Sequence, residues 1–82
     1  MMTPTNATRA ERAEQALNTF TTNVNYSRSP AELEPGNRAD AIADLICDLL
    51  HYAVEQGFSP ELLLEQAKMN FEFEQAQAEQ QA

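Results

Sequence analysis

Five side chains that could take part in acid–base or metal chemistry recur near the middle of the chain at spacings of four, four, three and four residues. On an α-helix, which turns by about 100° per residue, these spacings place all of them on one narrow face. Apolar side chains occupy the opposite face of the same predicted helix. The ionisable face consists of Asp40, Asp44, Asp48, His51 and Glu55, and the apolar face of Ile42, Leu45, Ile46, Leu49 and Ala53.

A metal site is one chemistry that this face could support. Asp48 and His51 have the i, i+3 spacing with which a carboxylate and an imidazole of one helix share a metal in di-metal helical bundles. Ligands in such bundles face inward, whereas this face lies opposite the apolar one. We therefore favour a solvated polar face, in which His51 pairs with Asp48 or Glu55. Asp44, Asp48 and His51 are the candidate ligands if a metal binds, and we predict neither a metal nor another cofactor.

Two further side chains are candidates for chemistry. A nucleophilic thiol needs positively charged neighbours, and Cys47 lies beside carboxylates, so we predict that it packs at the edge of a contact surface. Arg38 stands near the start of the same helix, where the backbone amides favour anions. Arg38 is therefore the candidate anion-binding residue, and no catalytic residue is predicted.

Length and charge narrow the classes of function. A chain of 82 residues forms one small domain, and a core of that size yields only about 3–5 kcal/mol. One cysteine cannot form an internal disulfide that would support so small a core. Oligomerisation is the remaining common support, so we predict a homodimer. The net charge of −8 argues against binding to nucleic acid or to anionic membranes. Without an apolar leader or a membrane span, and with a lone cysteine, we expect a cytoplasmic protein.

The hydrophobic periodicity predicts an all-α protein of three helices. The first covers residues 8–23, with Thr8 and Glu11 as a capping box. A connector with one turn at Ser29-Pro30-Ala31-Glu32 leads to the second helix, residues 38–56. Gly57 is its left-handed C-cap, and Ser59-Pro60 begins a third helix that runs to about residue 75 or beyond. We expect a mobile segment 1–7, one domain 8–75 and a frayed tail 76–82.

The short break around Gly57 predicts a tight hairpin of the second and third helices within a dimeric bundle. The first helix would pack across this hairpin through Leu17, Phe20 and Val24. The dimer would bury Ile42, Ile46, Leu49, Leu63, Ala67 and Phe71.

The segment ADLICDLLHYAVEQGFSPELLLEQAKMNFEFE resembles the second half of MazG-type nucleotide pyrophosphohydrolases. Asp44 matches an aspartate of that family and Gly57 its interhelical glycine. The resemblance implies magnesium held by Glu-x-x-Glu and Glu-x-x-Asp pairs. Ala41 replaces the glutamate of the second pair, and Asn70 stands where a basic residue is usual. The resemblance thus implies a degenerate enzyme.

A second resemblance covers almost the whole chain. Ala16, Leu17 and Phe20, then ADLICDLLHYA, GFSPE and AKMNFEFE, are similar to short uncharacterised proteins of bacteria, phages and plasmids. This resemblance implies an origin in mobile elements and no known activity.

These observations favour a non-enzymatic protein that binds a protein partner with a basic surface. The carboxylate face would imitate nucleic acid, as small phage inhibitors of the anti-CRISPR type do. The alternatives are a dimer that binds a nucleotide or another small molecule through Arg38, and a degenerate MazG-like enzyme dependent on Asp44.

Overall fold

The computed structural model describes residues 5–23 and 29–81 of the chain. Within these residues the fold consists of helices α1 (Asn6–Asn23), α2 (Pro35–Glu55) and α3 (Pro60–Gln81), with a short 3₁₀ turn η1 (Pro30–Glu32) and no strand. The predicted all-α class is confirmed. No helix in this part of the chain is both long and apolar enough to cross a membrane.

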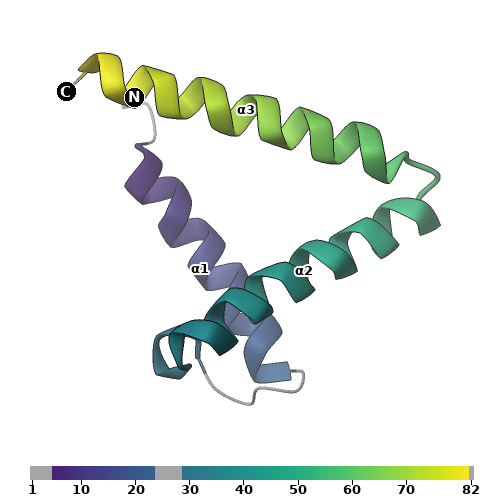
Figure 1. Ribbon diagram of the computed structural model, residues 1–82. Coiled ribbons are helices and arrows are strands. Elements are labelled where there is room, and N and C mark those ends of the chain that lie inside the picture. The colour runs from purple at the N-terminus through teal and green to yellow at the C-terminus, as the bar shows by residue number, and fades with distance from the viewer. Residues whose placement is uncertain (1–4, 24–28, 82) are drawn as a thin grey trace.

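The three helices form an open triangle (Figure 1). The second half of α1 crosses the first half of α2, with η1 beside the crossing. The chain reverses between α2 and α3, and α3 then returns to the beginning of α1. The radius of gyration is 14.6 Å, against about 12 Å for a compact chain of this length. Helices α2 and α3 are joined by a short turn and diverge from it (Figure 1). The tight hairpin within a dimeric bundle stays a prediction.

Helix α1 begins earlier than the sequence predicts. The hydroxyl oxygen of Thr5 accepts a hydrogen bond from the amide of Thr8 at 3.1 Å, so Thr5 caps the helix. The prediction that Thr8 is the cap is wrong, because Thr5 offers the same hydroxyl three residues earlier. Asn6 and Ala7 are therefore helical and do not belong to the expected N-terminal segment, whose residues 1–4 lie outside the described residues, as does Val24.

Helix α2 also begins early and ends where predicted. Pro35 occupies its first position, where a fixed φ favours the helix and no amide hydrogen is needed. Gly57, at φ +83°, is the left-handed residue after the helix. Its amide donates to the carbonyl of Val54 at 3.0 Å, and the Phe58 amide donates to the carbonyl of Ala53 at 2.9 Å. This pair of bonds is the Schellman motif, and it confirms the predicted end.

The starts of η1 and α3 confirm the predicted turns, with one change. The Ser59 hydroxyl accepts from the amide of Leu62 at 3.3 Å, as an N-cap does. Helix α3 then continues to Gln81 and includes most of the predicted tail. At η1, the Ser29 hydroxyl donates to the Glu32 carboxylate at 2.7 Å and does not bond to a backbone amide.

The core lies at the crossing of α1, η1 and α2. Leu17, Leu33 and Ala41 are buried there, and Phe20 and Leu45 pack against them. Thr21 is also fully buried, and its hydroxyl donates to the Asn18 carbonyl at 3.2 Å. Leu17 and Phe20 were predicted to pack across the hairpin of the second and third helices. They do pack against the rest of the chain, but their neighbours are α2 and η1. The residues predicted to be buried in a dimer are exposed in the single chain: Ile42, Ile46, Leu49, Leu63, Ala67 and Phe71.

Candidate functional site

The ionisable face of α2 is a continuous exposed line of side chains, which we call the acidic column. It consists of Asp40, Asp44, Asp48, His51 and Glu55, all of them exposed. Column positions lie on one side of α2, and the apolar stripe of Ile42, Ile46 and Leu49 lies on the other. The structure thus keeps the column accessible from outside the triangle.

The contact between α1 and α2 determines which parts of α2 stay open. Ala41 is fully buried and Leu45 is half-buried against Leu17 and Leu33. On the helix, Ala41 and Leu45 lie between the acidic column and the centre of the apolar stripe. Helix α1 therefore covers the border between the two faces, and leaves both the column and the stripe uncovered.

Arg38 has a clear structural role. Its Nε atom donates to the carbonyl oxygen of Pro30 at 2.9 Å, and its Nη2 atom donates to the carbonyl oxygen of Leu33 at 2.9 Å. The guanidinium thereby joins η1 to the first turn of α2 and satisfies two carbonyls of the connector. The predicted anion-binding role of Arg38 stays a prediction, to be weighed against these two bonds.

The three candidate metal ligands do not form a metal site within one chain. Among the described residues, no three His, Cys, Asp or Glu side chains are grouped so that they could hold a metal ion. Asp44, Asp48 and His51 follow one another along α2 and do not converge. Cys47 is a free, exposed thiol on the same helix.

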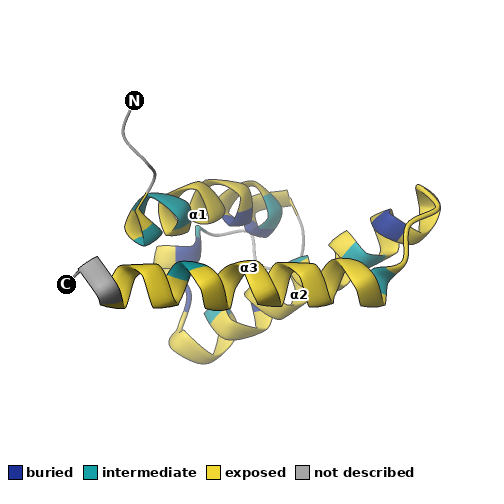
Figure 2. Ribbon diagram, turned by 90° about the horizontal axis from the view of Figure 1, so that it is seen from above, coloured by how far each residue is buried: buried dark blue, intermediate teal, exposed yellow. Residues whose placement is uncertain are grey.

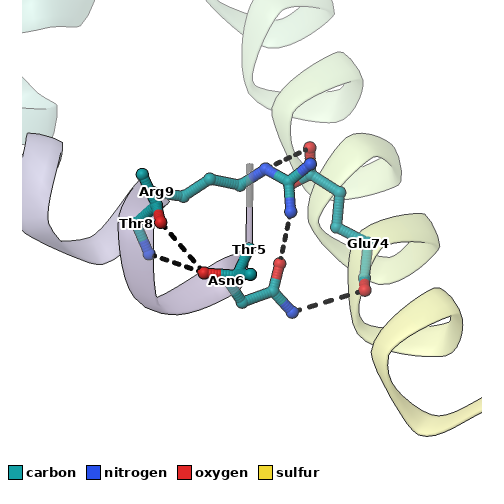
Figure 3. Close-up of polar contacts among 5 residues, drawn as sticks. All are labelled: Thr5, Asn6, Thr8, Arg9 and Glu74. Carbon is teal, nitrogen blue, oxygen red and sulfur yellow. Dashed lines mark hydrogen bonds and ion pairs between the residues drawn. The ribbon is translucent and has the colours of Figure 1, made fainter. Parts of the chain in front are cut away.

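A polar cluster that the sequence did not predict closes the triangle between α1 and α3 (Figure 3). Arg9 Nε lies 3.1 Å from Glu74 Oε2, and Arg9 Nη1 donates to Asn6 Oδ1 at 2.7 Å. Asn6 Nδ2 in turn donates to the carbonyl oxygen of Glu74 at 3.3 Å. We call Asn6, Arg9 and Glu74 the clasp. No local signal could have shown it, because its two sides are more than sixty residues apart.

A shallow depression lies between α1 and η1. Its lining contains a single ionisable side chain, Glu14, so it lacks the convergent groups that a catalytic site needs. The lining residues are Glu14, Gln15, Asn18, Ser29, Pro30 and Ala31.

The chain matches no family model, no curated protein and no solved structure. The resemblances to MazG-type enzymes and to short proteins of phages and plasmids therefore stay predictions. The candidate site depends on the geometry of the described residues alone.

Proposed function

We propose that this chain is a non-enzymatic, cytoplasmic, homodimeric module, carried by a phage or another mobile element, that binds a protein partner through the acidic column. The partner would present a surface rich in lysine and arginine, such as a groove that ordinarily holds nucleic acid. The observation that carries this proposal is the exposure of all the column residues along one helix. Ala41 and Leu45 of the same helix pack against Leu17 and Leu33, so the first half of the column lies on a part of α2 that is held in the core.

The dimensions of the column suit a nucleic-acid mimic. From residue 40 to residue 55 it extends for about 22 Å, at 1.5 Å per residue. Phosphates of one DNA strand repeat about every 3.4 Å along the helix axis, so the column is about as long as six of them. Its carboxylates are fewer than those phosphates, but the helix holds their backbone, so only the side chains have to be ordered on binding. The net charge of −8 adds long-range attraction to a basic partner.

Neither alternative has a supporting contact among the described residues. A nucleotide-binding dimer would depend on Arg38, whose Nε and Nη2 atoms already bind two carbonyls. A MazG-like enzyme would need several convergent carboxylates for magnesium, and within residues 5–23 and 29–81 no three His, Cys, Asp or Glu side chains are grouped to hold a metal ion. Nucleotide turnover with magnesium that is lost in Asp44→Ala would revive the enzyme, and phosphate binding lost in Arg38→Ala would revive the binder.

The test compares two variants of equal charge. The triple variant Asp40→Asn, Asp48→Asn, Glu55→Gln removes three charges from the column. The control variant Glu61→Gln, Glu65→Gln, Glu72→Gln removes three charges from exposed positions of α3. Each protein is immobilised and exposed to bacterial lysate, and the affinity of any captured partner is then measured with purified components.

We expect the column variant to bind the captured partner at least tenfold more weakly than wild type, and the control variant to bind it as wild type does. Wild-type binding should weaken steeply between 50 and 300 mM salt, roughly as the Debye length falls. Duplex DNA should compete for the partner. Equal losses in both variants, or no loss in either, would disprove a role for the column.

A further inference from the structure

Two helices of the triangle expose apolar stripes that no other part of the described chain covers. On α2 the exposed fractions are 43% for Ile46 and 56% for Leu49, and on α3 they are 40% for Leu63 and 59% for Phe71. The stripes recur at intervals of three and four residues, which is typical of a helix face that packs against other helices. We call them together the inner face: Ile42, Ile46 and Leu49 on α2, with Leu63, Ala67 and Phe71 on α3.

Both stripes face the inside of the triangle. Ala53 continues the stripe of α2 by one step of four residues, and it is buried beside the turn that leads to α3. Glu74 continues the stripe of α3 by one step of three residues, and it reaches across to Arg9 of α1. The two stripes therefore border the space between α2 and α3, and Figure 1 shows how these two helices diverge from their turn.

The exposed area is large for a protein of this size. The chain exposes 6759 Å², whereas a folded monomer of 9.2 kDa exposes about 4,900 Å² by the usual scaling. The excess is about 1,800 Å² for one chain. A homodimer that covered only half of this excess on each of two chains would already bury about 1,800 Å² in total, which lies within the standard size of a stable interface, about 1,200–2,000 Å².

From this area and this chemistry we infer that a second copy of the chain covers the inner face, with the α2–α3 pairs of the two copies forming a four-helix arrangement. The inference specifies the homodimer of the proposed function. The core at the crossing is too small to support the fold by itself, so the cover must be present whenever the chain is folded. A second copy meets this condition, because an obligate homodimer folds and assembles together.

The charge distribution also fits two identical partners. Every side chain of the inner face is uncharged, so two strongly acidic chains can meet through these surfaces without bringing charges together. The residues are Ile42, Ile46, Leu49, Leu63, Ala67 and Phe71. The acidic column lies on the opposite side of α2 from Ile46 and Leu49. A dimer of this kind would keep both columns exposed, and would present two carboxylate lines on one particle.

The experiment measures the mass of the full-length protein by sedimentation equilibrium from 1 to 100 μM. We expect twice 9.2 kDa for wild type, and a melting temperature that rises with protein concentration. In Ile46→Glu, two buried carboxylates would oppose each other or lose water, so the dissociation constant should rise at least 100-fold. The matched control is Leu62→Glu, an exposed leucine on the outer side of α3, which should stay dimeric.

A second measurement uses the wild-type protein alone, so it does not depend on whether the variants fold. Hydroxyl-radical footprinting measures which side chains of the dimer are accessible to solvent. We expect protection of Leu49 and Phe71, and modification of Leu62. A wild-type monomer at 100 μM, or a dimer broken by Leu62→Glu and not by Ile46→Glu, would overturn the inference. So would modification of Phe71 in a wild-type dimer. The column variant Asp40→Asn, Asp48→Asn, Glu55→Gln should stay dimeric, so loss of partner binding and loss of the dimer are separate results.

Discussion

Two corners of the triangle hold α1 to the rest of the chain through different kinds of contact. At the crossing with α2, Leu17 and Ala41 exclude water, and Arg38 binds two carbonyls of the connector. At the meeting with α3, Asn6, Arg9 and Glu74 form a clasp whose ion pair is about one-third exposed on each side. Buried apolar area stabilises far more than exposed charge pairs do. The stability of the single chain is therefore concentrated at one corner.

The largest effect is expected from a substitution in the apolar corner. Leu17→Ala removes a buried side chain where α1, η1 and α2 meet, and such changes cost about 2–5 kcal/mol. We expect the midpoint of urea unfolding, followed by circular dichroism at one fixed protein concentration, to fall accordingly, because the contribution of the dimer is then the same in both proteins. The control is Leu62→Ala, at an exposed position, which should change stability by less than about 0.5 kcal/mol. A folded Leu17→Ala protein with unchanged urea midpoint would show that the corner does not dominate.

An intermediate effect is expected at Arg38. Arg38→Lys keeps the charge but lacks the planar group that reaches Pro30 and Leu33 together. We expect a loss of about 1–3 kcal/mol in urea unfolding, as for hydrogen bonds from a charged donor. The matched control is Arg12→Lys on the exposed side of α1. Equal midpoints for the two variants would mean that the carbonyl contacts contribute little.

The smallest effect is expected at the clasp. Arg9→Ala removes the ion pair with Glu74 and the hydrogen bond to Asn6, and exposed pairs of this kind contribute about 0–1 kcal/mol. A double-mutant cycle of Arg9→Ala and Glu74→Ala isolates the coupling of the two side chains. The coupling should shrink in 0.5 M salt, because exposed charges are screened. A coupling above about 2 kcal/mol that ignores salt would make the two corners equivalent.

Local signals explain which parts of the fold could be predicted. The end of α2 and the start of α3 were predicted because Gly57, Ser59 and Pro60 act on the backbone within a few residues. The acidic column follows from spacing on one helix, whereas its exposure in the single chain comes from the structure. The true starts of α1 and α2 were missed by two or three residues, because Thr5 offers an earlier cap for α1 and Pro35 an earlier first position for α2.

The packing could not be predicted from the same signals. Periodicity identifies Ile42, Ile46 and Leu49 as the centre of an apolar face, and predicts that neighbouring helices cover it. The structure instead places α1 against Ala41, whose small side chain permits a close approach at the edge of that face. Contacts such as Asn6 with Glu74 join distant parts of the chain and depend on the path of every element between them.

The exposure of α3 has a consequence for the exchange of its amide hydrogens with solvent. Every residue from Glu61 to Phe73 is exposed, between a half-buried Pro60 and a half-buried Glu74 (Figure 2). In a single chain these amides would be protected only by the helix itself, and an uncovered helix opens easily. Each amide would then exchange almost as fast as in a free peptide. Slow exchange across the middle of α3 would therefore record how long a second copy of the chain covers the helix. Leu62, in the first turn of α3, is left out of this comparison.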